Sequence, residues 1–108
     1  MKDVRRFDVF LVNLDPTIGS EIKKTRPAVV ISPNEMNRFV NTVIIAPMTS
    51  KVKGYPSRVA LKFRNKKGEA VLDQIRTVDK ARLVKKLGAV TKKESEDISA
   101  TLLEIFRF

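Results

Sequence analysis

The 108-residue sequence contains no cysteine and no histidine. Without cysteine it has no disulfide, no thiolate metal site and no thiol nucleophile; without histidine it lacks the commonest metal ligand and the commonest general base. Any catalysis must therefore depend on Asp, Glu, Lys, Arg, Ser, Thr or Tyr. No carboxylate pair has the spacing of a two-metal site, and no glycine-rich phosphate loop precedes a helix. We therefore expect neither a metal nor a cofactor.

Long apolar runs are also absent. The segment Phe7–Leu14 is apolar, but it is too short for a signal peptide and is interrupted by Asp8 and Asn13. Nothing approaches the length of a membrane-spanning helix, so we expect a cytoplasmic protein with no membrane partner. The length fits one domain, and 43% apolar residues suffice for a core. We therefore expect a single domain over residues 1–108.

The charge is unevenly distributed along the chain. The net charge is +10, and residues 22–93 carry 18 Lys and Arg against four acids. The two ends together carry four Lys and Arg against eight acids. A basic middle section favours a polyanionic partner such as nucleic acid, although a solvated basic face would give the same composition.

Several segments have the composition of β-strands. Phe7–Asn13, Pro27–Ser32 and Thr42–Met48 are apolar, and the last two are predicted to be buried because their β-branched residues run together. Pro47 should lie near the end of its strand or at an edge, because it cannot donate to a ladder. Arg58–Arg64 alternates between apolar and polar residues, which predicts a half-exposed strand with a basic outer face.

The elements that follow are predicted from turn and capping residues. Asn65–Gly68 is expected to form a turn, and Glu69–Arg76 a further strand. Asp79 is expected to cap a short helix over Lys80–Lys86, which Gly88 would end.

The C-terminal segment predicts an amphipathic helix. Thr91 and Glu94 fit a capping box. The apolar residues after them share one helical stripe: Ile98, Leu102, Ile105 and Phe106. Short strands with few helices favour a mainly β (α+β) fold. We expect a small SH3-like or OB-like antiparallel barrel with short helices and this C-terminal helix.

Polar residues follow or precede these strands at their ends, where a rigid sheet can hold a site. Arg26 could hold a phosphate through two parallel donors, or it could be an ordinary surface Arg. Thr49 could donate its hydroxyl to a phosphate or bond the backbone. Asp73 could be a carboxylate base or the ion-pair partner of Arg76. The residues alone leave these alternatives open.

Five motifs occur in order along almost the whole chain. They are VFLVNLDP at residues 9–16, GSE at 19–21, RPAVVIS at 26–32, APMTSK at 46–51 and DQIRTVD at 73–79. This ordered set resembles the MazF/PemK/Kid toxins of type II toxin–antitoxin systems. The resemblance implies an SH3-like barrel that acts as a homodimer. It also implies sequence-specific, metal-independent cleavage of single-stranded RNA such as mRNA, and neutralisation by a MazE-like antitoxin whose acidic segment occupies the RNA groove.

The resemblance also assigns residues to these roles. Arg26 and Thr49 match the catalytic pair of the family, and Asp73 matches a base proposed in its Kid branch. Residues 19–24 match the flexible loop that covers the RNA. We expect contacts to the RNA backbone or bases from Ser20, Glu21, Lys23, Lys24, Asn37, Ser50, Lys51, Lys53, Gln74 and Arg76. Within this set Asn37, Gln74 and the loop near Glu21 are the candidates for reading base edges.

Without a metal site, cleavage would use the 2′-hydroxyl of the RNA as the nucleophile. The products would carry a 2′,3′-cyclic phosphate and a 5′-hydroxyl, and DNA would resist. Arg26 is expected to stabilise the charge that develops on phosphorus, and Thr49 to donate a second hydrogen bond to the same oxygens.

Other functions also fit this fold. A gyrase poison of the CcdB type shares it, but the resemblance places that activity in a C-terminal Trp-Gly-Ile. This chain has no tryptophan and ends in IFRF. A non-catalytic RNA-binding barrel would fit the charge, and only Arg26 and Thr49 argue against it. A degenerate toxin kept for regulation would have much the same sequence as an active one.

Overall fold

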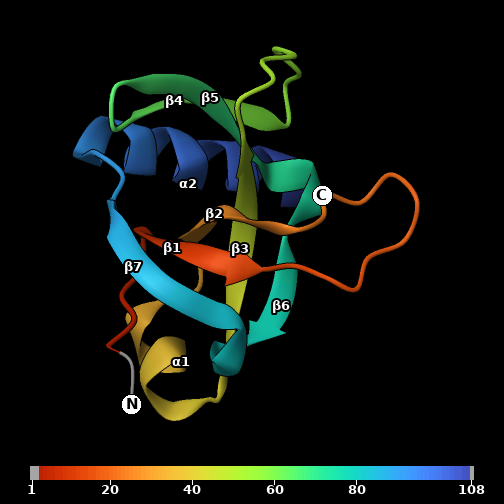
Figure 1. Ribbon diagram of the computed structural model, residues 1–108. Helices are drawn as coiled ribbons and strands as arrows, with labels where there is room; N and C mark the ends of the chain where they lie inside the picture. The colour runs from red at the N-terminus through yellow and green to blue at the C-terminus, as the bar shows by residue number, and fades with distance from the viewer. Residues whose placement is uncertain (1–2, 108) are drawn as a thin grey trace.

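The computed structural model describes residues 3–107, which form a curled antiparallel sheet with short helices (Figure 1). The strands are β1 (Asp8–Asn13), β2 (Thr25–Val30), β3 (Thr42–Thr49), β4 (Arg58–Phe63), β5 (Lys66–Val71), β6 (Arg76–Asp79) and β7 (Leu83–Ala89). The helices are α1 (Asn34–Phe39) and α2 (Lys92–Phe106), with 3-10 turns η1 (Leu72–Gln74) and η2 (Lys80–Arg82). The strand order is β4-β5-β3-β2-β1-β7, and β6 also pairs with β3. The expected mainly β class with a C-terminal helix is confirmed.

Strands β1, β2 and β3 are buried on both faces, which explains the continuous apolar runs in their sequences. Val29 packs on one face with Val9 and with Ile98 of α2. Its neighbour Val30 packs on the other face with Val12. Each such side chain contributes about 1.5–3 kcal/mol when it is fully buried. The buried side chains on these two faces therefore hold in place the strands whose ends carry the predicted site.

Strand β3 changes partner along one edge. Residues Thr42 to Ile45 pair with β6, and Met48 and Thr49 pair with β5. Pro47 lies in the interval between these two partners and two residues before the end of the strand, as its sequence position predicted.

The expected turn at Asn65–Gly68 is wrong. The turn is Arg64-Asn65, where both residues have positive φ, 50° and 64°. A two-residue hairpin loop of this kind matches the twist of its strands. Strand β5 therefore begins at Lys66 and pairs Gly68 with Leu61 inside the ladder. The strand expected over Glu69–Arg76 is accordingly divided into β5, η1 and β6.

The expected helix over Lys80–Lys86 is also wrong. Asp79 does accept a 2.8 Å hydrogen bond from the Ala81 N–H, but the helix it caps is the single turn η2. The chain then continues as β7, which pairs with β1 and buries Leu83 completely. Tertiary pairing with β1 thus overrides the local helical pattern.

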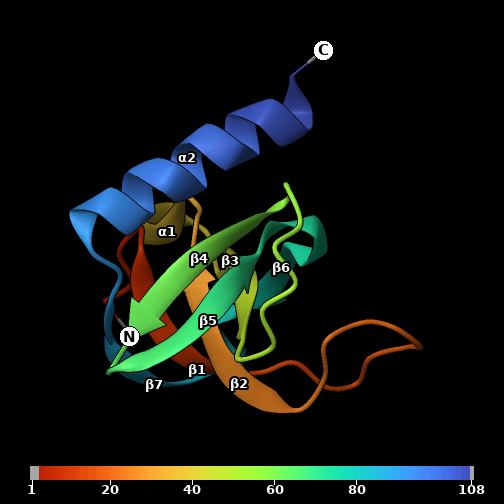
Figure 2. The ribbon, with the colours of Figure 1, turned by 90° about the horizontal axis from the view of Figure 1, so that it is seen from above.

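Helix α2 begins with the predicted capping box. The Thr91 hydroxyl accepts from the Glu94 N–H, and the Glu94 carboxylate accepts from the Thr91 N–H. The predicted apolar stripe is buried only near its start: Ile98 is fully buried, whereas Phe106 is 68% exposed. Figure 2 shows the helix crossing the sheet above β4, with its last turns extending beyond the sheet. None of the helices within residues 3–107 is long and apolar enough to cross a membrane.

Candidate active site

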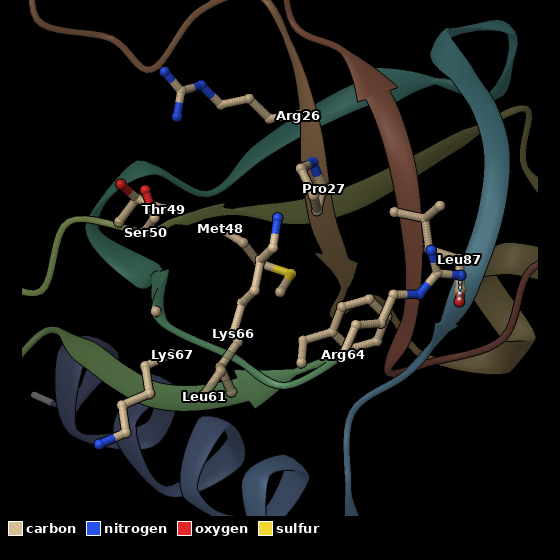
Figure 3. A pocket seen from close by; sticks show the side chains of 12 residues that line it. Arg26, Pro27, Met48, Thr49, Ser50, Leu61, Arg64, Lys66, Lys67 and Leu87 are labelled. Carbon is tan, nitrogen blue, oxygen red and sulfur yellow. Dashed lines mark hydrogen bonds between the residues drawn. The ribbon is translucent and has the colours of Figure 1, made fainter.

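Arg26 and Thr49 lie at the facing ends of two paired strands. The β2–β3 ladder pairs Ala28 with Pro47. Continuing this register by two residues places Arg26 opposite Thr49, and residues opposite each other on paired strands share one face of the sheet. Both residues line a cavity of about 330 Å³ (Figure 3). The structure therefore brings the two predicted catalytic residues to one site.

The guanidinium of Arg26 is oriented by the loop that precedes it. Its Nε donates a 2.8 Å hydrogen bond to the carbonyl oxygen of Lys23. No carboxylate among residues 3–107 forms an ion pair with it. The two Nη groups therefore remain as a planar pair of donors, which is the arrangement that grips a phosphate through two oxygens.

The hydroxyl of Thr49 is also held by backbone. Its Oγ1 accepts a 3.1 Å hydrogen bond from the Lys51 N–H. Because the oxygen acts here as the acceptor, the hydroxyl proton stays available for donation. Ser50 lines the same cavity. A phosphate between the two strand ends could therefore receive donors from both sides.

Gly68 of β5 lies directly against the backbone of Thr49, a contact that the sequence did not reveal. A Cβ at this position would overlap the carbonyl oxygen of Thr49, so only glycine permits β5 to approach β3 this closely. The next residue of β5, Glu69, pairs with Thr49 in the β3–β5 ladder. The wrong turn assignment concealed Gly68, since a glycine beside Asn65 is easily explained as a turn residue.

Five predicted RNA-contacting or catalytic residues line a second cavity of about 420 Å³, namely Ser20, Glu21, Asp73, Gln74 and Arg76. Gln74 Oε1 accepts a 2.7 Å hydrogen bond from the Ile22 N–H, and Arg76 donates a 2.9 Å bond to the Leu14 carbonyl. Both side chains therefore anchor the loop between β1 and β2. Pro47 of β3 also lines this cavity, so the second cavity lies beside the strand that carries Thr49.

Asp73 forms its ion pair with Arg58, and the alternative partner Arg76 bonds the backbone instead. The Asp73 carboxylate accepts hydrogen bonds from Arg58 Nε at 3.1 Å and from Ser57 Oγ at 3.0 Å. Burial opposes ionisation of this carboxyl, but the bonds from Arg58 and Ser57 outweigh it and lower its pKa. A carboxylate stabilised in this way is a weaker proton acceptor, which disfavours Asp73 as the base.

Comparison with known proteins identifies the family. The family model of the PemK-like, MazF-like toxins of type II toxin–antitoxin systems matches residues 5–106. The chain belongs to this toxin family. It is 38% identical over 96 residues to the endoribonuclease toxin MazF of Escherichia coli K12, covering 88% of this chain and 86% of that protein.

Solved structures agree with this assignment. A crystal structure of MazF from Deinococcus radiodurans is similar with a TM-score of 0.85 and 25% identity, over 97% of both chains. A mycobacterial endoribonuclease in complex with its cognate antitoxin has the same fold, with a TM-score of 0.81 over 94% of this chain and 93% of that one. The family match favours the ribonuclease hypothesis over the gyrase-poison and non-catalytic alternatives.

Four of the remaining residues that were predicted to contact RNA are lysines on two loops of this MazF-like toxin. Lys23 and Lys24 lie on the β1–β2 loop, and Lys51 and Lys53 lie on the β3–β4 loop, all exposed. The β3–β4 loop contributes Ser50 to the first cavity, and the β1–β2 loop contributes residues 20–22 to the second, so the four lysines are exposed on the loops that border the two cavities.

The prediction for Asn37 needs correction. Its side chain is only 2% exposed, and its amide donates to the Ser32 carbonyl and accepts from the Ser32 hydroxyl. Lys80 Nζ also donates to its backbone oxygen. Asn37 is therefore part of a buried network in α1, where it cannot read a base.

The predicted basic outer face of β4 also needs correction at Arg58, whose side chain is 12% exposed and lies between Glu69 and Asp73. Glu69 is 2% exposed, and its two oxygens accept hydrogen bonds from the Lys53 N–H at 3.1 Å and the Gly54 N–H at 2.8 Å. Glu69 therefore fixes the loop that follows Thr49. No local pattern in the sequence indicates this role, because it depends on a loop 15 or 16 residues away.

We expect Glu69→Gln to destabilise the toxin by about 1–3 kcal/mol at neutral pH, because the two loop N–H groups bond different carboxylate oxygens and the amide NH2 would face one of them. Burial opposes ionisation of Glu69, but bonds from Gly54 and Lys53 and the charge of Arg58 lower its pKa. Its contribution to stability is therefore present above the unfolded pKa, near 4.3, and is lost as the pH falls through the lower folded value. Urea unfolding between pH 3 and pH 7 measures both effects.

In that experiment the acid-induced loss of stability should be smaller in Glu69→Gln than in the wild type. Glu35→Gln, a matched change at an exposed position of α1, should follow the wild type. Equal acid-induced losses in Glu69→Gln and the wild type would rule out the role given to the Glu69 carboxylate.

No group of three or more acidic side chains within residues 3–107 is arranged to hold a metal ion.

Proposed function

We propose that this chain is a sequence-specific, metal-independent endoribonuclease toxin that cleaves single-stranded RNA. The observation that carries the proposal is the pair Arg26 and Thr49, which come from the neighbouring ends of β2 and β3 and line one cavity with no acidic residue in its lining. A site of this kind favours negative charge that develops on a phosphate. The similarity to a MazF named an endoribonuclease toxin supports the same activity.

The reaction follows from the groups present. The 2′-oxygen of the RNA attacks the adjacent phosphorus and loses its proton, while the bond from phosphorus to the 5′-oxygen breaks. The 5′-oxygen takes up a proton, so the products carry a 2′,3′-cyclic phosphate and a 5′-hydroxyl. Arg26 stabilises the added charge on the non-bridging oxygens through its Nη groups, and Thr49 donates to the same oxygens. DNA lacks the nucleophile.

Asp73 has a smaller part in this proposal than the sequence suggested. Its carboxylate is engaged by Arg58 and Ser57, so it holds the start of β4 against the turn that lines the second cavity. The second cavity supplies the carboxylate of Glu21 to read a base edge, while Gln74 holds the loop that carries it by accepting from the Ile22 N–H. The lysines of the two loops hold the RNA backbone.

We also propose that the toxin works in the cytoplasm as a homodimer and that an acidic antitoxin neutralises it. The net charge of +10 suits an acidic segment laid over the RNA site. The exposed apolar end of α2, where Leu103 is 74% and Phe106 68% exposed, is a surface that a second copy would cover.

Incubation of purified protein with a mixed-sequence single-stranded RNA in excess EDTA tests the proposed activity. We expect discrete cuts in the RNA, no cuts in a DNA copy and no cuts with Arg26→Ala. An absence of cleavage across a broad set of sequences would contradict the proposal.

A further inference from the structure

The cavity beside Arg26 and Thr49 extends into an apolar pocket that the proposed reaction does not use. Beyond the catalytic pair, its apolar lining comes from β2, β3, β4 and β7: Pro27, Met48, Leu61, Phe63 and Leu87. The volume of about 330 Å³ is far larger than a phosphate group requires. The pocket therefore has room for an apolar part of the substrate next to the reacting phosphate.

The pocket lies where the two end strands of the sheet meet without pairing, and side chains fill the space between them. The sheet path ends at β4 and β7, and no ladder joins these two strands within the described residues. Instead the Phe63 ring packs against Gly88, where a Cβ would lie 3.3 Å from the ring. The Arg64 guanidinium donates to the Leu87 carbonyl. These contacts fix the aromatic ring as one wall of the pocket.

Cations surround the mouth of this apolar pocket. Arg64, Lys66 and Lys67 line it together with Arg26, and the lining contains no Asp or Glu. Figure 3 shows the Lys66 side chain rising through the middle of the pocket towards the side that carries Arg26. Neither Lys66 nor Lys67 forms an ion pair with a carboxylate of residues 3–107. An apolar interior with a cationic rim is complementary to a flat base joined to phosphates.

We propose that this pocket binds the nucleobase of one of the two nucleotides that flank the scissile phosphate, and that Lys66 binds the phosphate beyond it. The inference rests on the proposed ribonuclease function and adds a substrate subsite to it. A base is favoured over an acidic peptide because the pocket is continuous with the two residues that hold the scissile phosphate. The flanking base is the next group along the RNA.

The lining also determines how the base is recognised. Its only neutral polar side chains are the hydroxyls of Thr49 and Ser50, and it contains no amide or carboxylate. Base edges therefore find few partners there, and the contact depends on stacking and burial, which tolerate any base. Sequence preference then belongs to the second cavity, where Glu21 and Gln74 lie.

A binding experiment with altered RNA tests this subsite directly. The RNA is the sequence cut in the cleavage assay, made uncleavable by a 2′-deoxy nucleotide at the scissile position, with an abasic site at either flank in turn. At one flank the abasic site should weaken binding to the wild type about tenfold, the loss typical of one stacked base. In Phe63→Leu, which removes the ring but keeps an apolar side chain, the same abasic site should cost less than about threefold.

Phe39→Leu provides the matched control, because Phe39 is 79% exposed on α1 and lines no part of the pocket. It should respond to the abasic site as the wild type does. Equal losses in Phe63→Leu and the wild type, or no loss at either flank, would overturn the inference and leave the ribonuclease function intact. Failure of the wild type to cut or bind any RNA would overturn both.

The salt dependence of binding tests the role of Lys66. Lys66→Gln should reduce the slope of log affinity against log salt by about 0.7, the value for one phosphate contact on a single strand. Lys92→Gln, at an exposed position at the start of α2, should leave the slope unchanged. An unchanged slope in Lys66→Gln would remove Lys66 from the subsite.

Discussion

Arg26→Lys is expected to retain most of the RNA affinity while the cleavage rate falls by roughly 10²–10³-fold. The substitution keeps the positive charge but loses the planar pair of Nη donors. It also loses the bond from Nε to the Lys23 carbonyl, which orients the guanidinium in the wild type. Single-turnover cleavage of a short RNA, together with binding of its uncleavable 2′-deoxy form, separates these two effects.

The matched control for this change is Arg38→Lys, because Arg38 is an exposed residue of α1 and lines neither of the two cavities beside Thr49. Its cleavage rate should equal that of the wild type. Near-normal turnover in Arg26→Lys would contradict the bidentate role, since any cation at this position would then suffice.

Gly68→Ala is the second substitution with a large expected effect. The added Cβ would overlap the carbonyl oxygen of Thr49, so the end of β3 or the middle of β5 has to shift. A displacement of about 1 Å in a catalytic group can cost ~10²-fold in rate. Overpacking of this kind also destabilises a fold by about 1–3 kcal/mol. We therefore expect a folded but strongly impaired enzyme.

Gly54→Ala is the control for this variant. Gly54, unlike Gly68, carries a positive φ, of 70°, and a Cβ there would meet nothing within 4 Å. Its cost should be limited to backbone strain, and its cleavage rate should remain within a few-fold of wild type. Circular dichroism and urea unfolding show whether Gly68→Ala is folded. A folded Gly68→Ala with wild-type turnover would disprove the coupling between Gly68 and Thr49.

The parts of the fold that the sequence predicted well are those with a strong local pattern. The runs around Val29 and Ile45 indicated buried strands because both faces of those strands are covered. The capping box of Thr91 and Glu94 is a local motif and formed as expected. Strand β7 was missed because its pairing with β1 is a tertiary contact, for which a basic segment such as Lys85-Lys86 gives no local signal.

The candidate site divides in the same way. Arg26 and Thr49 were identified from motifs, and the strand register explains why they meet. Glu69 and Gly68 could not be identified, because their importance arises from contacts with the Lys53–Gly54 backbone and with Thr49, which only the folded chain brings near. Asn37 was wrongly included because its burial depends on how α1 packs, which its polar side chain does not indicate.

The central claim is that the RNA supplies its own nucleophile while Arg26 and Thr49 stabilise the phosphorane. A single 2′-deoxy nucleotide at a mapped cleavage site, assayed in excess EDTA beside the all-ribose RNA, tests it most directly. We predict that the all-ribose RNA yields 2′,3′-cyclic phosphate and 5′-hydroxyl ends, whereas the bond after the 2′-deoxy nucleotide stays intact. Cleavage of that bond, or products with 5′-phosphate ends, would contradict the mechanism.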